Sequence, residues 1–529
     1  MSVAEAAAIG AVLALASRVL ALVLHRRWFR QGFAGDSSAH LAIVRTLRRR
    51  PTARWIDEYV IAPEPMSYPT GFHRIAALFP RALLEAHSWL PNLLLWIAGI
   101  AAFAGYSAFA ARSLLHVDPT STVWPALAFM LVTPSSVVFQ GPAIAYLKLS
   151  ERLLGRLATA FAVLLLVVGT IAHHDASLVA AAVAVAVAFT SSIFARQAIV
   201  FGLLFLALLL WAWQPLAVLA AGGVFALAIG RARFVQGLRH TWIQWHLYGR
   251  LTKASSHVGS ELSHFARFGE LRVALRDREA RSRLIGSREP IRAIVFYPEI
   301  VVAATLLGFN WHEFGWHWSA PLVVFVALYL ATATQRFNHL GEAYRYLEYG
   351  LFLLVPFELA LLVQSWSLVE RLILIVAFAV WSATLAMRAI VRGTWLASLP
   401  DRDVLSDFLR KVDLRPGDVV FPVSMHLAID ICARVDGVRS FWWQPGIIST
   451  GIYDEFIEEY PYLKREYQPL FERYAVTHVV CDKSDLARLD WAYDFSDLLL
   501  LTEDDRYAAF AVPRPAASLT GAIDNEAVR

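Results

Sequence analysis

The residues best suited to chemistry follow the first apolar segment of the chain. Residues 35–40 read Gly-Asp-Ser-Ser-Ala-His, so the carboxylate of Asp36 precedes the imidazole of His40 by one helical turn. Further along, Tyr68 and His73 stand in the sequence Tyr-Pro-Thr-Gly-Phe-His. An acid at a membrane boundary is costly and is therefore often functional. The spacing predicts an active site at one face of a membrane.

Each of these residues also has a structural interpretation. Asp36 would cap a helix that begins at Ser-Ser-Ala-His. His40 could assist Asp36, contact a phosphate, bind a divalent metal together with Asp36, or simply lie at the membrane interface. Glu64, in the rigid sequence Ala-Pro-Glu-Pro, is a candidate second acid. Tyr68 and His73 could pack the loop instead of contacting a substrate.

The composition indicates the elements that must position these residues. Hydrophobic residues make up 57% of the chain, charged residues 17%, and the mean hydropathy is +0.50, which together exclude an ordinary soluble protein. The 18 tryptophans are typical of interfacial belts. Residues 3–24 lack a basic leader and a cleavage site of small residues, so we expect an uncleaved span.

A membrane-spanning helix needs about 20 apolar residues, and about eleven segments qualify. They are residues 4–24, 90–111, 123–140, 153–172, 176–194, 197–213, 215–230, 293–310, 318–334, 349–366 and 369–388. The segments 197–213 and 215–230 are divided by Gln214 and Pro215, and they could instead form one kinked helix, which would invert all later segments.

Three parts of the chain are polar. We expect a transmembrane domain over residues 1–398, a soluble α/β domain over 399–513 and a disordered tail over 514–529. Within the first, the loop 25–89 has ten Lys or Arg and five acids, and the loop 231–292 has thirteen and five. These loops could hold anionic lipid phosphates, or they could carry ordinary cytosolic positive charge.

The polar C-terminal part has the pattern of a small α/β domain. A helix is expected over residues 403–412, and strands over 419–421, 474–482, 498–501 and 507–512. The only two cysteines, Cys432 and Cys481, lie in this region and could form a disulfide or remain buried thiols. No nucleotide-hydrolysis motif and no thiolate zinc motif occurs, and no nucleic-acid partner is expected.

The order of these motifs resembles the GT-C superfamily of integral-membrane glycosyltransferases. An apolar helix is followed by residues 35–40, residues 68–73, the sequence Ser-Glu-Arg-Leu-Leu-Gly-Arg at 150–156, and Arg336 with Glu-Ala-Tyr-Arg-Tyr at 342–346. The resemblance implies a GT-C-type helical bundle and a polyprenyl-phosphate-sugar donor, with the loop 231–292 against that lipid. It also implies that Asp36 serves the chemistry, although Ser37 stands where the family often has a second acid.

The implied reaction determines which residues are wanted. A base must take the proton of the acceptor hydroxyl, and cations must stabilise the departing phosphate. Asp36 is the candidate base, with His40 and Glu64 beside it. Arg336 and Arg345 are the candidate phosphate ligands, because a guanidinium presents a planar fork to phosphate oxygens. Their alternative role is to extend to the lipid head groups.

The remaining expectations concern ligands and place. Glu342, Tyr68 and His73 are candidate substrate contacts, and the acceptor is a glycan, lipid or protein. No cofactor is implied with certainty, although a divalent metal at Asp36 and His40 is one option. We expect a bacterial-type inner membrane, with the site and the C-terminal domain outside the cytoplasm. The alternative is a non-catalytic membrane protein or a transporter of lipid-linked glycans, for which Glu299 and Glu358 are the main intramembrane acids.

The expected orientation conflicts with the distribution of positive charge. With residues 25–89 outside and eleven spans, both basic loops lie outside, whereas basic loops usually lie in the cytoplasm. The rule weakens for loops of about 60 residues, which is the size of these two. We therefore predict that a C-terminal tag is cleaved by protease added to spheroplasts. A protected tag would invert the orientation.

Overall fold

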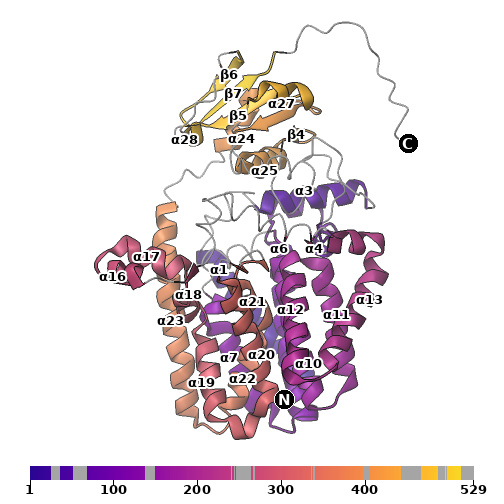
Figure 1. Cartoon of the computed structure of the whole chain (residues 1–529), viewed down its shortest axis with the longest axis vertical. Helices are drawn as coiled ribbons and strands as arrows, with labels where there is room; N and C mark the ends of the chain where they lie inside the picture. The colour runs from indigo at the N-terminus through magenta and orange to yellow at the C-terminus, as the bar shows by residue number, and fades with distance from the viewer. Residues whose placement is uncertain are drawn as a thin grey trace.

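The computed structural model shows a bundle of apolar helices with a small α/β domain at one end (Figure 1). It describes residues 1–24, 36–51, 68–137, 149–239, 241–242, 245, 264–265, 268–334, 336–337, 340–396, 404–423, 425–441, 466–486, 495 and 497–513. The predicted tail 514–529 and the candidate acid Glu64 lie outside these residues.

Helices lie at every predicted apolar segment. They are α1 (Val3–Leu24), α6 (Leu90–Phe109), α7 (Pro119–Val132), α8 (Pro134–Val137), α10 (Arg152–Ile171), α11 (Asp175–Ser191), α12 (Ile193–Leu210), α13 (Gln214–Gly230), α18 (Ile291–Phe296), α19 (Pro298–Phe309), α20 (Trp311–Thr332), α21 (Tyr344–Gly350), α22 (Leu354–Leu362) and α23 (Leu368–Leu396). A π-helical turn, η1 (Ala110–Leu114), extends α6. Trp211 has a φ of 53°, and the chain reverses there, so α12 and α13 are two helices and not one kinked helix.

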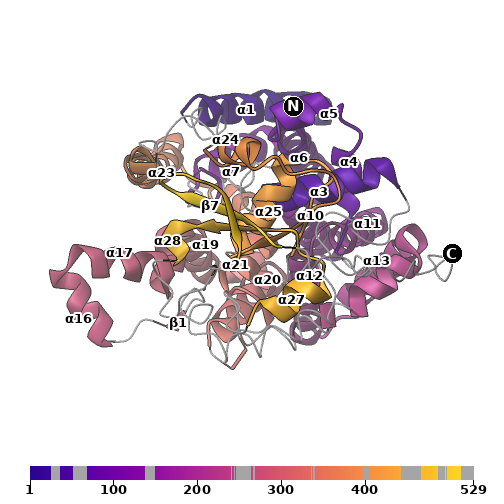
Figure 2. The same ribbon diagram turned by 90° about the horizontal axis from the view of Figure 1, so that it is seen from above.

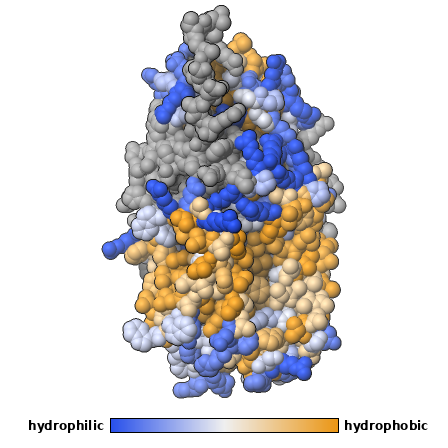
Figure 3. Space-filling view, turned by 90° about the vertical axis from the view of Figure 1, so that its right-hand side faces the viewer, coloured by the Kyte–Doolittle hydropathy of each residue, from blue (hydrophilic) through white to orange (hydrophobic). Residues whose placement is uncertain are grey.

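The bundle has the surface of an integral membrane protein. Among the described residues, five helices are long and apolar enough to cross a membrane, or six if the bent pair Gln214–Gly230 and Ala232–Arg239 is one span. The count of eleven spans stays a prediction. On the face shown in Figure 3, an apolar belt lies between two hydrophilic ends of the molecule. Exposed Trp211, Trp213 and Trp311 lie in the turns that end α12 and begin α20, as expected at a membrane interface.

The polar elements gather at one end of the bundle (Figure 1). From the first loop come α3 (Asp36–Arg49), α4 (Gly71–Ala76) and α5 (Arg81–Ala86). From the second basic loop come α16 (Phe268–Arg276), α17 (Arg278–Ser287) and the paired strands β1 (His264–Phe265) and β2 (Arg288–Glu289). Seen from above, α16 and α17 extend beyond the bundle (Figure 2).

In the part of the C-terminal domain that the structure describes, five strands form a sheet in the order β4-β3-β5-β7-β6. Its strands are β3 (Val419–Pro422), β4 (Arg439–Ser440), β5 (His478–Asp482), β6 (Leu499–Glu503) and β7 (Tyr507–Ala511), and its helices are α24 (Val404–Val412), α25 (Met425–Arg434), α27 (Gln468–Arg473) and α28 (Lys483–Leu486). β3 is parallel to β4 and β5, whereas β7 is antiparallel to β5 and β6. This confirms the predicted fold class, and both cysteines are buried free thiols.

Helix α3 belongs to the cores of both parts of the molecule. Its Ala39, Ala42, Ile43 and Leu47 pack in the same apolar cluster as Val419 and Phe421 of β3. Its Leu41 and Val44 pack instead with Phe72 of α4 and Leu84 of α5. The helix is therefore buried between the first loop and the C-terminal domain, although it begins 368 residues before α24.

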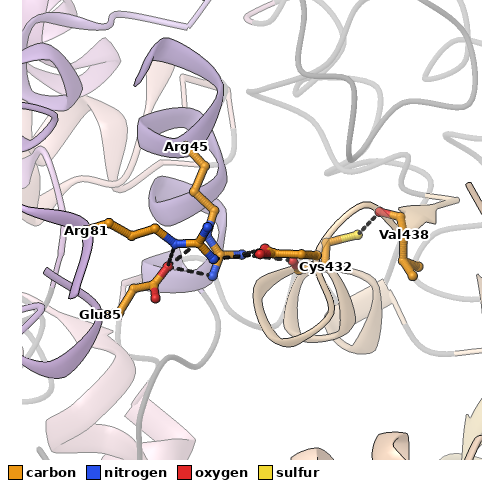
Figure 4. A network of polar contacts seen from close by, with 6 residues as sticks. Arg45, Arg81, Glu85, Cys432 and Val438 are labelled. Carbon is orange, nitrogen blue, oxygen red and sulfur yellow. Dashed lines mark hydrogen bonds and ion pairs between the residues drawn. The ribbon is translucent and has the colours of Figure 1, made fainter. Parts of the chain in front are cut away.

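Charged side chains at the edge of this apolar core also join the first loop to the C-terminal domain (Figure 4). Arg45 of α3 reaches Glu85 of α5, with Nη2 2.9 Å from Oε1. Its Nη1 lies 3.3 Å from Oδ1 of Asp436 and donates to the carbonyl of Cys432 at 3.4 Å. Arg81 contacts the same two carboxylates, at 2.9 Å from Glu85 and 2.6 Å from Asp436. The C-terminal domain is thus tied to two helices of the first loop.

A substitution in α3 should therefore unfold the C-terminal domain. Ile43 is fully buried in the shared core, and Ile43→Ala should cost about 2–5 kcal/mol by loss of packing and creation of a cavity. We expect faster thermolysin cleavage within residues 404–513 and a lower Tm in detergent. Leu78→Ala is the matched control, because Leu78 is 83% exposed in the same loop. Unchanged cleavage in Ile43→Ala would contradict the shared core.

Candidate functional site

Two histidines, a tyrosine and a glutamate contact one another at the end of the bundle that carries α3 and the C-terminal domain. We call His40, Tyr68, His73 and Glu151 the histidine cluster. Nε2 of His40 lies 2.8 Å from Oε2 of Glu151, and its Nδ1 lies 2.9 Å from Nε2 of His73. The hydroxyl of Tyr68 donates to Oε1 of Glu151 at 2.6 Å. His40 thus bridges a carboxylate and a second imidazole.

Close packing of the backbone positions these side chains. His73 is on α4, which begins at Gly71, where an added Cβ would lie 2.8 Å from the carbonyl oxygen of Thr190. Only glycine permits this approach of α4 to the end of α11. Glu151 precedes α10, and the amide of Asn92 donates to the carbonyl of Ser150 at 3.1 Å to fix that turn. His40 comes from α3, so three separate segments converge.

Burial and neighbouring charges set the protonation states. Burial alone would raise the pKa of Glu151, but the charge and hydrogen bond of His40 lower it well below its ordinary value. Burial, together with the nearby His40, lowers the pKa of His73 to about 3. At neutral pH Glu151 is therefore a carboxylate and His73 is neutral. In a neutral His40 that donates its Nε2 proton to Glu151, Nδ1 carries no proton and accepts a hydrogen bond from Nε2 of His73.

Asp36 is the first residue of α3, one turn before His40. The backbone of Asp36 is among the described parts of the structure, whereas its side chain is not. Beside it, Ser37 and Ser38 are buried, and the hydroxyl of Ser38 donates to Oδ1 of Asp430 at 2.9 Å. The start of α3 is therefore held from above by α25 of the C-terminal domain.

A second group of charges surrounds the start of α21. We call Arg152, Arg292, Glu342, Tyr344 and Arg345 the arginine cluster. Nε of Arg345 lies 3.0 Å from Oε2 of Glu342. The guanidinium carbon of Arg292 lies 3.9 Å from the ring centroid of Tyr344, and that of Arg345 lies 4.8 Å from the same centroid. Arg152 interacts electrostatically with Glu342.

Deeper in the bundle, Arg345 is joined to a buried ion pair. Its Nη1 lies 3.3 Å from Oε2 of Glu348, and Oε1 of Glu348 lies 3.7 Å from Nη1 of Arg156. Arg156 also donates to the carbonyls of Glu348 and Ser135, at 3.2 and 3.1 Å. Arg156 and Glu348 line a small pocket together with Ser135, Tyr297, Glu299 and apolar side chains.

The two clusters adjoin through consecutive residues. Glu151 belongs to the histidine cluster and Arg152 to the arginine cluster, and both interact electrostatically with Tyr349 of α21. The histidine cluster, which begins one turn after Asp36, and a group of guanidinium cations thus lie side by side at one end of the bundle. Such cations can stabilise negative charge that develops near them.

The structure brings together several residues predicted from the sequence. His40, Tyr68 and His73 contact one another one turn after Asp36, and Arg345 contacts Glu342. Arg336 is exposed in the turn after α20, and its guanidinium carbon lies 5.8 Å from the ring centroid of Phe337. Its role as a phosphate ligand stays a prediction.

Two acids at the centre of the network were not singled out from the sequence. Glu151 stands at the boundary of an apolar span in Ser-Glu-Arg, and Glu348 stands in the apolar run of α21. An acid next to an arginine at the start of a span could have identified Glu151. Nothing in the local sequence indicates that Glu348 pairs with Arg156, which is 192 residues away.

The histidine cluster does not fit a metal site as it stands. Among the described residues, no three His, Cys, Asp or Glu side chains are placed to hold one metal ion. Both ring nitrogens of His40, the predicted ligand, are engaged by Glu151 and His73.

Comparison with known proteins gives likeness of structure alone. No protein-family model and no curated protein sequence matches the chain. The chain is similar to the oligosaccharyltransferase of Archaeoglobus fulgidus in complex with Zn and sulfate, with 14% identity, a TM-score of 0.49, and coverage of 94% of this chain and 71% of that chain. The same enzyme tethered with an acceptor peptide containing the NVT sequon aligns with 11% identity, a TM-score of 0.49, and coverage of 90% and 68%. ArnT of Cupriavidus metallidurans in the apo state aligns with 14% identity, a TM-score of 0.41, and coverage of 94% and 97%. At these values the alignments carry no functional conclusion.

Removal of the buried carboxylate should destabilise the fold in a pH-dependent way. Glu151→Gln should lower stability at pH 7 by about 1.5–3 kcal/mol, because it removes the charge of a buried carboxylate that is hydrogen-bonded by His40 and Tyr68. The folded-state pKa lies below the ordinary value of 4.5, so the contribution of Glu151 is present above pH 4.5 and is lost as the pH falls toward the folded-state pKa. The Tm difference in detergent should therefore shrink below pH 4.5.

The control is Glu313→Gln, at an exposed glutamate of α20, which should leave the Tm unchanged. A Tm difference for Glu151→Gln that is constant between pH 3 and pH 7 would show that Glu151 is not charged in the folded protein.

Proposed function

We propose that the chain is a membrane glycosyltransferase that moves a sugar from a polyprenyl-phosphate donor to an extracytoplasmic acceptor. The observation that supports this proposal best is the union of the histidine and arginine clusters through Glu151 and Arg152, at the head of an apolar bundle. Sugar transfer from a lipid phosphate needs a base and a cationic site for the leaving phosphate next to each other, within reach of a bilayer.

Asp36 acts as the base in this proposal. It accepts the proton of the acceptor hydroxyl while that oxygen attacks the anomeric carbon and the bond to the donor phosphate breaks. His40 lies one turn away on the same helix, and Glu151 and Tyr68 fix the orientation of its cluster. His40 is then a positioning residue.

Arg345 stabilises the negative charge that develops on the departing phosphate. Its guanidinium is buried and already oriented by Glu348, so little reorganisation is needed when the charge forms. Exposed Arg336 is the candidate contact for the lipid head group before the donor enters. The basic loop 231–292 would lie along the donor lipid, and the acceptor would approach beneath the C-terminal domain.

The orientation of the protein in the membrane follows from the same proposal. Lipid-linked sugars are used on the far side of the bacterial inner membrane, so the end of the bundle that bears α3 and the C-terminal domain would be extracytoplasmic. The alternative of a glycan transporter would instead use buried Glu299 and Glu358. Glu299 lies in the pocket beside Arg156, and among the described residues we find no cation that contacts Glu358, so transport has the weaker support.

Loss of the base should abolish transfer without loss of the fold. We predict that Asp36→Asn lowers the transfer rate by about 10²–10⁴-fold, which is the usual contribution of a general base. The assay supplies membranes with a panel of radiolabelled polyprenyl-phosphate sugars and follows the label by thin-layer chromatography. Unchanged elution and Tm in detergent would establish that the variant is folded.

The matched control is Asp505→Asn, at an exposed aspartate of the β6–β7 turn, which should retain full transfer. Equal rates for Asp36→Asn and the wild type would remove Asp36 from the chemistry. Accumulation of lipid-linked glycan on one side of vesicles, with no transfer by the wild type, would favour the transporter.

A further inference from the structure

Two cations flank one aromatic ring at the start of α21. The guanidinium groups of Arg292 and Arg345 both lie within 5 Å of the ring centroid of Tyr344. Arg292 comes from α18 and Arg345 from α21, so two separate elements bring like charges together. Such a pair is stable only with anionic neighbours, and cations stacked on an aromatic ring keep their N–H edges free for an anion.

Glu342 supplies one of these anions, and it lies at the outer side of the cluster. Its carboxylate is 3.0 Å from Nε of Arg345, and its side chain is 32% exposed, whereas that of Arg345 is 5% exposed. Burial alone would raise the pKa of Glu342, but the charge of Arg345, a hydrogen bond with Tyr344, and the charges of Arg152 and Arg292 lower it to about 2. Glu342 is therefore charged at neutral pH and stands between the arginines and the surface.

The inner side of Arg345 has a different and permanent partner. Glu348 is fully buried, and it holds Nη1 of Arg345 at 3.3 Å while also pairing with Arg156. Displacement of Glu342 would therefore leave Arg345 anchored in place with its outer edge open. The side chain of Glu348 is 0% exposed, so it is not placed to exchange with an anion from solvent in the way that Glu342 is.

The turn before α21 sets Glu342 against Arg345. Gly341 has a φ of 119°, in the region that favours glycine, and an added Cβ would lie 2.9 Å from Oε1 of Gln197. Glu342 follows directly and is outside the helix. Its side chain can swing outward by rotation of its own torsions, because it already borders solvent and no helix has to move.

We propose that Glu342 is a built-in counterion that occupies an anion site formed by Arg292, Tyr344 and Arg345, and that a prenyl phosphate displaces it. A phosphate group presents three oxygens to two guanidinium forks, whereas Glu342 reaches Arg345 by one oxygen at one nitrogen. The exchange would keep the arginines paired when no donor is bound. The identity of the phosphate as that of the lipid donor rests on the proposed function, whereas the exchange itself does not.

The test measures binding to the full chain in detergent, with farnesyl phosphate as the probe. Glu342→Gln keeps the size of the side chain and removes its charge, so it should bind farnesyl phosphate about 5-fold to 50-fold more tightly than the wild type, within the usual range of coupling between competing ligands. Glu313→Gln is the control and should leave Kd unchanged. An unchanged or higher Kd in Glu342→Gln would overturn the proposal.

A second pair of variants keeps the result independent of folding effects. Arg292→Gln removes one of the two cations without touching the buried pair of Glu348, and it should weaken binding about 10-fold, the value of one charge-assisted hydrogen bond. In Arg292→Gln the further change Glu342→Gln should yield a smaller gain than in the wild type. An equal gain in both backgrounds would show that Glu342 and Arg292 do not share one site.

Two further probes distinguish the source of the phosphate. Inorganic phosphate and phosphatidylglycerol should bind more weakly than farnesyl phosphate. Equal binding of inorganic phosphate, with the same dependence on Glu342, would support the anion site and overturn its assignment to a prenyl donor. If the wild-type protein binds farnesyl phosphate in a Glu342-dependent way but transfers no sugar, the proposed function is wrong and the counterion exchange is still supported.

Discussion

The burial of α3 on two sides is the constraint on which the rest of the structure depends. One side of the helix completes the core of the C-terminal domain through Ile43 and its neighbours, and another packs on α4 and α5. The same helix carries Asp36 and His40, so their position relative to the bundle is set by packing from above and below. A site on a helix held in this way is more accurately placed than one on a free loop.

The two buried acids of these networks are stabilised because each contacts two partner side chains. Removal of a charge from water costs several kcal/mol, and a partner offsets that cost only when the geometry is good. Glu151 meets this condition with Tyr68 and His40, and Glu348 meets it with Arg345 and Arg156. Each acid has two partners from different segments, so the two networks also fix how those segments sit against α10.

The sequence was sufficient for features that depend on local periodicity. The apolar segments and the strands around Val419 and Cys481 follow from runs of apolar residues between turns. The sequence left open whether residues 197–230 form one kinked helix or two helices, and the left-handed backbone of Trp211 separates them into α12 and α13. The contact of Arg345 with Glu342 is also local, because the residues are three apart in the chain. In contrast, His40 meets Glu151 and Arg292 meets Tyr344 only after helices far apart in sequence have packed, and no local pattern encodes those contacts.

The packing of α3 in two apolar cores has a consequence for the folding of the chain during synthesis. The ribosome completes α3 hundreds of residues before β3 emerges, and the hydrogen bond of Ser38 with Asp430 joins positions 392 residues apart. During synthesis the apolar side formed by Ala39, Ala42 and Ile43 must therefore remain uncovered, a situation that invites association with a chaperone or with the lipid surface. The unit that folds at the end includes residues 36–49 together with the C-terminal domain, so a chimaera that exchanges this domain must exchange that helix as well.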